Sequence, residues 1–204
     1  METRCEWANK NEIMSKYHDE EWGKPLHDDQ KLFEFLILEG MQAGLSWLTI
    51  LRKREAFRRA YEDFDVKKVA NFDRNKVEEL MSNAGIIRNR LKIEASINNA
   101  GRFLEVAEEF GSFDRYIWSF VNGQPIVNRW QKSSEMPAKT ELSDQISNDL
   151  RKRGFKFVGS TVVYSHMQAT GMVNDHYTYC FCHPESKFGR KKRKKDRFSN
   201  LSFS

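Results

Sequence analysis

Apolar residues recur three and four positions apart along most of the chain, which is the period of amphipathic helices. Candidate N-terminal caps precede the earlier runs: Asp28 and Asp29, Ser46, Asp65 and Asp73. Later runs cover residues 93–106, 113–121 and 143–150. The pattern therefore predicts an all-α protein.

Three stretches depart from this pattern. Gly40 and Gly44 lie close together and predict a break between the first two helices. Residues 122–140 contain Gly and Pro and predict a long loop. Residues 155–173 mix β-branched side chains with helix formers, and we expect a helix there. The remaining sequence shows neither the alternation of paired strands nor an internal repeat.

The composition is that of a folded chain. With 204 residues, five Trp and fifteen Phe, it is long enough for one domain or two small lobes around a hydrophobic core. No apolar run reaches the length of a membrane span, and the N-terminus does not resemble a signal peptide. We therefore expect an intracellular protein without membrane contact, in which the three cysteines form no disulfide framework.

The net charge of +5 is concentrated at one end of the chain. Residues 187–197 carry eight basic side chains and one acidic one, and the rest of the chain has 26 basic and 28 acidic residues. We expect a helical domain over residues 1–184 and a basic, disordered tail over 185–204. Such a tail attracts polyanions without specifying one, as a solvated extension, a DNA tether or a nuclear-import signal.

Cysteine and histidine gather at the two ends of the expected domain. Cys5 and His18 lie near the start; His176, Cys180 and Cys182 lie near the end. Cys180 and Cys182 compete for one position, and Cys180 has the better helical spacing to His176. Two thiolates and two imidazoles would fill a structural zinc shell and leave no open position for a zinc hydrolase. The alternative is a set of scattered core cysteines and surface histidines.

Aromatic residues surround one carboxylate in the first quarter of the sequence. Glu39 interrupts an apolar run, and Trp7, Tyr17, Trp22 and Trp47 flank it. Aromatic faces with one acceptor suit a flat, cationic ring. The alternative is that the rings fill the core while Glu39 pairs with a lysine.

A glycine-containing turn at residues 83–90 separates two expected helices. Such a turn can present backbone N–H groups to a phosphate, although most helix pairs with one glycine do not. Alone, it is a weak indication of DNA binding.

Seven blocks together resemble the bacterial-type 3-methyladenine DNA glycosylase I family over about residues 4–184. They are Arg4-Cys5 with Trp7; Tyr17-His18-Asp19 with Trp22-Gly23; Leu38-Glu39-Gly40 with Gln42-Ala43-Gly44-Leu45-Ser46-Trp47; Ala84-Gly85-Ile86-Ile87-Arg88 with Arg90; Trp118-Ser119-Phe120-Val121-Asn122; Arg153-Gly154-Phe155-Lys156-Phe157-Val158-Gly159; and Met172-Val173-Asn174-Asp175-His176 with Cys180. Order and spacing make this a stronger signal than any single motif.

The resemblance implies a helix-hairpin-helix DNA glycosylase fold, with a structural zinc site that joins the N- and C-terminal segments. The implied zinc ligands are Cys5, His18, His176 and Cys180. The implied base-binding residues are Tyr17, Glu39, Trp47, Trp7 and Trp22. The implied DNA-binding residues are Gly44, Leu45, Gly85, Ile86, Ile87 and Arg88. Met14 stands where some relatives have an aromatic residue, and the basic tail lies outside the resemblance.

The implied activity is hydrolytic excision of 3-methyladenine from alkylated double-stranded DNA by a monomer without lyase activity. Glu39 is the candidate catalytic residue, chiefly for recognition and charge stabilisation, and no general base is assigned. The alternative is a non-catalytic, zinc-containing DNA-binding module, for which Glu39→Gln would leave function intact.

Overall fold

The protein is almost entirely helical in the computed structural model, which describes residues 3–186 and confirms the all-α prediction for them. The basic tail therefore lies outside the described residues from residue 187 on. In chain order the elements are η1 (Glu6–Lys10), α1 (Glu12–Glu20), α2 (Asp29–Gln42), α3 (Trp47–Ala60), η2 (Glu62–Phe64), α4 (Val66–Ala70), α5 (Arg74–Ser82), α6 (Arg90–Phe110), α7 (Phe113–Ser119), β1 (Ile126–Val127), η3 (Ser133–Glu135), α8 (Glu141–Lys152), α9 (Ser160–Ala169) and β2 (Val173–Asn174).

Side-chain caps begin the early helices where the sequence predicted them. Asp28 accepts a hydrogen bond from the amide of Lys31, and Ser46 accepts one from the amide of Thr49. Asp65 and Asp73 cap α4 and α5 in the same way. Each cap satisfies an amide that has no partner inside its helix.

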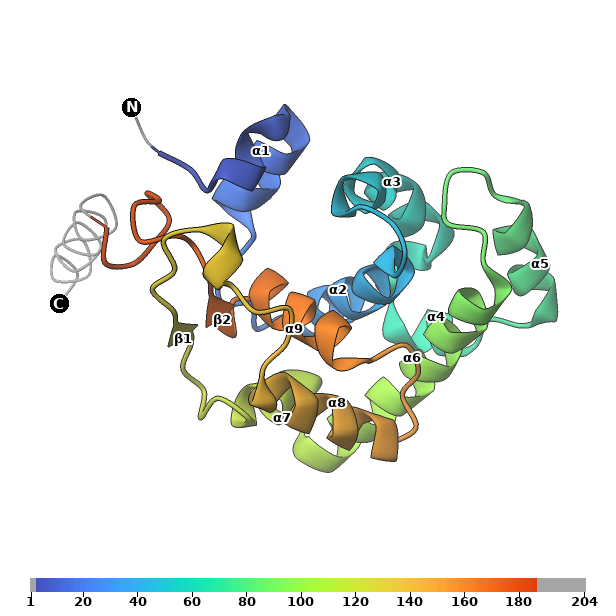
Figure 1. Ribbon diagram of the computed structural model, residues 1–204. Helices are drawn as coiled ribbons and strands as arrows, with labels where there is room; N and C mark the ends of the chain where they lie inside the picture. Colours follow the sequence, from blue (N-terminus) through green and yellow to red (C-terminus); the bar gives the residue numbers. More distant parts are fainter. Residues whose placement is uncertain (1–2, 187–204) are drawn as a thin grey trace, which may run out of the picture.

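Helix α2 runs through the middle of the molecule with α9 beside it, and α1 and α3 lie on the same side of it and contact each other (Figure 1). Every residue of α2 from Leu32 to Met41 is buried, including two glutamates. A helix that is buried all round must find partners for its charged groups, because an unpaired buried charge is costly. The site described below is built around one of these glutamates.

Two predictions need correction. Within residues 155–173, only Ser160–Ala169 is helical. Val173–Asn174 forms β2, which pairs in parallel with β1 from the expected loop. Two-residue strands are too short to show an alternating pattern, so sequence periodicity could not detect them. Gly40 stays inside α2, and the predicted break falls at Gly44, whose φ of +82° suits glycine.

The two ends of the described chain lie against each other (Figure 1). The amides of Gly23 and Leu26 donate to the carbonyls of Gln168 and Thr170, at 2.8 and 3.0 Å. A Cβ at Gly171 would collide with the backbone of Lys24. This close approach brings the N-terminal aromatic residues and the C-terminal cysteines together. Among the helices of residues 3–186, none has both the length and the apolar character to span a bilayer.

Candidate active site

Four buried side chains from the two ends of the chain converge on one point. The ligand atoms of Cys5, His18, His176 and Cys180 all lie within 4.8 Å of one another. His18 Nε2 is 3.1 Å from His176 Nδ1, and three of the sulfur-to-nitrogen distances lie between 3.4 and 3.7 Å. Zinc–ligand bonds at tetrahedral angles would separate such atoms by about 3.3–3.8 Å. The four side chains therefore fit a four-coordinate metal ion.

Neighbouring groups orient these side chains for coordination. His18 Nδ1 is 2.8 Å from an oxygen of Asp19, and His176 Nε2 is 2.9 Å from the carbonyl oxygen of Trp22. These contacts leave the other ring nitrogens for a metal, as second-shell partners do in metal sites. Backbone amides donate to both sulfurs, from Tyr177 to Cys5 and from Cys182 to Cys180.

The structure favours Cys180 over Cys182 as the fourth member of this group. Cys182 joins a separate arrangement with His18 and Asp19, at the edge of the first. The choice of Cys180 rested on helical spacing to His176, and that reason was wrong. The segment from His176 to Cys180 is a turn and not a helix, so the chain reversal, and not helical periodicity, brings the two side chains together.

An aromatic pocket adjoins the Cys/His group. The Trp22 ring contacts the His176 ring edge-on at 4.7 Å between centroids, and the Trp7 ring contacts Trp22 edge-on at 4.9 Å. Tyr17 and Trp47 continue the wall, with centroids 5.5 Å apart. The cavity measures about 260 Å³ and is lined by Trp7, Met14, Tyr17, Trp22, Glu39, Gln42, Trp47, Ser165 and Gln168.

Glu39 is the acidic group in this pocket. It is 4% exposed, and burial raises the pKa of its carboxyl to about 8. Two buried polar atoms at the pocket, Glu39 Oε2 and Trp47 Nε1, have no hydrogen-bond partner within the described part of the chain. Because buried polar atoms in native proteins are nearly always satisfied, these two atoms are available to a polar ligand in the pocket.

The structure brings together all five predicted base-binding residues, and Met14 also lies in the pocket wall. Sequence reasoning missed Gln42, Ser165 and Gln168 as lining residues. Gln42 lies within a block that carried the family resemblance, which is the signal that could have identified it. Ser165 and Gln168 reach the pocket only because α9 packs beside α2 (Figure 1), and nothing local in the sequence indicates this.

The raised pKa of Glu39 makes stability depend on pH. The folded protein holds the proton of Glu39 more tightly than the unfolded chain does. The stability that this protonation contributes is therefore fully present below pH 4.5, the ordinary pKa of the carboxyl, and is lost as the pH rises through 8. Glu39→Gln has no such group. The quantity to compare is the unfolding free energy of Glu39→Gln minus that of wild type. We expect this difference to be about 3–5 kcal/mol more favourable to the variant at pH 9 than at pH 4. Urea unfolding at both values measures this, and a pH-independent difference would contradict it.

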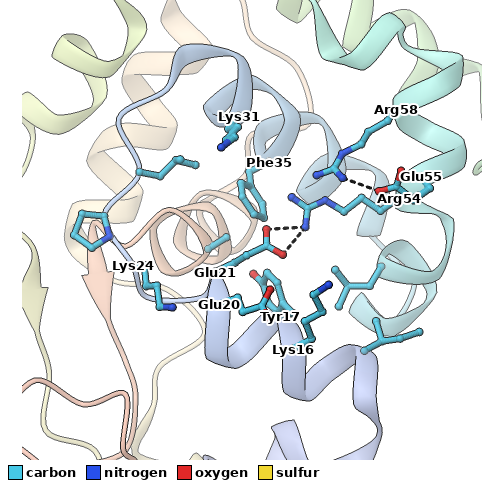
Figure 2. Close-up of a pocket in the computed structure, with 15 residues that line it drawn as sticks. Lys16, Tyr17, Glu20, Glu21, Lys24, Lys31, Phe35, Arg54, Glu55 and Arg58 are labelled. Atoms are coloured by element: carbon cyan, nitrogen blue, oxygen red, sulfur yellow. Dashed lines mark hydrogen bonds and ion pairs between the residues drawn. The ribbon is translucent and has the colours of Figure 1, made fainter. Parts of the chain in front are cut away.

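On the far side of Tyr17 lies a second hollow of about 720 Å³, between α1 and the α2–α3 pair (Figure 2). Arg54 dominates it. Its guanidinium donates to both carboxylate oxygens of Glu21, at 2.8 and 2.7 Å, and to Glu34 at 2.7 Å. It also lies over the ring of Phe35, 5.0 Å from its centroid. The hollow is therefore lined by a network of ion pairs that packs behind the wall of the aromatic pocket.

Loss of Arg54 is expected to destabilise the fold. Arg54 is 8% exposed and Glu34 is 5% exposed. Arg54→Met would leave Glu34 buried with only Arg58, and breaking such a pair costs about 3–5 kcal/mol. Arg58→Met is the matched control and should cost less, because the Arg58 side chain is 34% exposed. Equal losses of unfolding free energy in urea would show that burial does not decide the effect.

The predicted DNA-binding residues fall in two exposed connections. Gly44 and Leu45 lie between α2 and α3, and the Leu45 side chain is 42% exposed. Gly85, Ile86, Ile87 and Arg88 lie in the hairpin between α5 and α6. The Ile86 side chain is buried. The amides of Ile87 and Arg88 donate to no acceptor within residues 3–186.

The aromatic slot with one buried carboxylate has a lining that suits a flat, polar ring. Comparison with known proteins gives the family. The methyladenine glycosylase family model matches residues 7–183. The chain therefore belongs to the methyladenine glycosylase family.

Characterised relatives match nearly the whole chain. It is 50% identical to DNA-3-methyladenine glycosylase 1 of Escherichia coli, over 90% of this chain and 98% of the relative. It is 48% identical to DNA-3-methyladenine glycosylase of Haemophilus influenzae, over 89% and 98%. A solved variant of 3-methyladenine DNA glycosylase I in complex with 3-methyladenine has a TM-score of 0.86 at 37% identity, over 90% of this chain and 99% of its own. The protein is thus a glycosylase enzyme, which excludes the non-catalytic module.

Proposed function

We propose that this protein excises 3-methyladenine from alkylated double-stranded DNA as a repair enzyme. Relatives of about half identity carry that activity in their names, and a similar structure holds the free base. The observation that carries the proposal is the pair of unsatisfied atoms, Glu39 Oε2 and Trp47 Nε1, in a slot walled by aromatic rings. A purine ring offers both a face for the rings and polar edges for these atoms.

The chemistry of the substrate suits this slot. Methylation at N3 makes adenine cationic in DNA, and aromatic faces attract cationic rings. Glu39, once ionised, can accept from the exocyclic amine and offset the positive charge. The glycosidic bond breaks with its electron pair passing to the base, which leaves neutral. A water oxygen then bonds to the sugar carbon and its proton is released to solvent, so no strong general base is required.

Extrusion of the base requires contacts outside the slot. Unstacking costs a few kcal/mol, and Leu45 is placed to fill the vacated space while the hairpin amides bind phosphate. Within the described residues, no lysine lines the slot. We therefore propose a monofunctional enzyme without lyase activity. We also propose that it acts as a monomer and holds DNA through a helix-hairpin-helix element.

We propose zinc as the metal of the Cys/His group. The donor set of two thiolates and two imidazoles is one that zinc prefers, and it leaves no position for water or substrate. A bound zinc would supply only a structural link between the ends of the chain. His18 and His176 also contact the rings of Trp7 and Trp22, so this link would support the wall of the slot.

Base-release chromatography on methylated duplex DNA tests the proposed function. Wild-type protein should release free 3-methyladenine and leave abasic sites in equal number. The backbone should stay intact until alkali is added. Absence of released 3-methyladenine would refute the proposal, and enzymatic strand cleavage would refute its monofunctional part.

A further inference from the structure

Lys92 joins two parts of the protein that the proposed mechanism treats separately. It lies in the first turn of α6, directly after the hairpin, and is 9% exposed. Its Nζ donates to the carbonyl oxygens of Met41 and Ala43, at 2.9 and 2.6 Å. These carbonyls are at the C-terminal end of α2, immediately before Gly44 and Leu45. A cation is favoured there because the last carbonyls of a helix lack partners within it.

The backbone of Lys92 is itself fixed to the hairpin. Its amide donates to the side chain of Asn89, at 3.2 Å, and Asn89 is the N-cap of α6. A second lysine, which lies after the loop of residues 43–46, reaches back to the hairpin. Lys53 of α3 donates to the carbonyl oxygen of Ala84 in the hairpin, at 2.8 Å. Three lysine–carbonyl contacts from two lysines therefore tie the hairpin to the end of α2 and to α3, on either side of the loop of residues 43–46.

Other roles for Lys92 fit the structure poorly. It does not line the aromatic slot, and burial alone raises the pKa of Glu39, so Lys92 is not the partner of that carboxyl. Its ammonium group already donates to two carbonyls and is largely shielded from solvent, which does not suit a phosphate contact. The loop that it reaches is exposed from Ala43 to Ser46 and therefore has little packing to hold it.

We propose that Lys92 is a positioning residue that holds Leu45 at a fixed distance from the DNA-binding hairpin. This inference rests on the proposed function. The hairpin sets the register of the duplex, and Lys92 places Leu45 at the base pair from which the base is extruded. The residue would thus matter for opening a duplex and not for holding a base that is already accessible.

Lys92→Met removes both contacts at nearly constant volume. We expect kcat/KM for methylated duplex DNA to fall about 10- to 100-fold, since a displacement near 1 Å can cost that much. The value for methylated single strands should fall less than about threefold, because no partner strand has to be displaced. Lys92→Arg retains donors for both carbonyls and should restore most of the duplex activity.

The test measures 3-methyladenine release from both substrates for wild type, Lys92→Met, Lys92→Arg, Leu45→Ala and the double variant Lys92→Met/Leu45→Ala. If Lys92 acts through Leu45, the double variant loses no more than the worse single variant. Free 3-methyladenine, titrated by tryptophan fluorescence, should bind Lys92→Met as it binds wild type. The salt dependence of abasic-duplex binding should be unchanged, whereas loss of a phosphate contact would lower its slope by about 0.9.

Equal losses on duplex and single strands, additive losses with Leu45→Ala, or full duplex activity in Lys92→Met would each overturn the inference. If Lys92→Met does not fold, Lys53→Met breaks the contact with Ala84 and must show the same duplex-selective loss. A wild-type protein that released no 3-methyladenine would instead refute the proposed function, so the two failures are distinguishable.

Discussion

Glu39→Gln is expected to lower 3-methyladenine release from methylated duplex DNA by about 100- to 1000-fold, the range found when one charge-stabilising group is removed from an active site. The amide keeps the shape of the side chain but not its charge. Its oxygen can still accept from the exocyclic amine, so the loss should appear mainly in kcat. Single-turnover release, measured by chromatography, separates that step from product dissociation.

Binding of abasic duplex DNA by Glu39→Gln provides the control for folding and DNA contact. We expect wild-type affinity, because the hairpin and the loop of Leu45 are untouched. Glu20→Gln, an exposed change in α1, should leave release at the wild-type rate. Rates within about threefold of wild type for Glu39→Gln would show that the carboxylate has no part in the reaction.

Removal of the metal is expected to destabilise the fold as a whole. Cys5→Ser or His176→Ala should abolish stoichiometric zinc and lower the unfolding free energy by about 5 kcal/mol or more, since metal binding contributes directly to folding. For a chain of this size, that corresponds to a fall in Tm of about 10–20 °C. Metal analysis and thermal denaturation measure both effects.

Cys182→Ser is the matched control for this set, because Cys182 lies beside the group but outside it. It should keep one zinc per chain and the wild-type Tm. Zinc loss in Cys182→Ser, with retention in a Cys180→Ser variant, would reverse the assignment. A stable, zinc-free and fully active Cys5→Ser protein would refute the structural role.

Local sequence signals predicted much of the fold because their causes are local. A cap such as Ser46 acts on amides three residues away, and the apolar period of α6 reflects a single face. The parallel pairing of Ile126 with Val173 depends on residues far apart in sequence. Such pairing leaves no local pattern in either segment.

Without the family resemblance, the candidate site was predictable only in its residue types. Glu39 could be selected as a charge in an apolar run, but the sequence did not say whether a lysine would neutralise it. The buried cation Arg54 pairs with Glu34 and not with Glu39, which lies five residues after Glu34 in α2. Lys92 gave no signal at all, because its carbonyl partners lie about 50 residues away along the chain.

A crystal structure of the protein with 3-methyladenine tests the central claim most directly. We predict that the base lies against the rings of Tyr17 and Trp47, with its exocyclic amine within hydrogen-bond distance of Glu39 Oε2. The base should satisfy the polar atoms that the protein leaves without partners. A base bound in the hollow beside Arg54, or a Glu39 side chain turned away from the bound ring, would contradict the account.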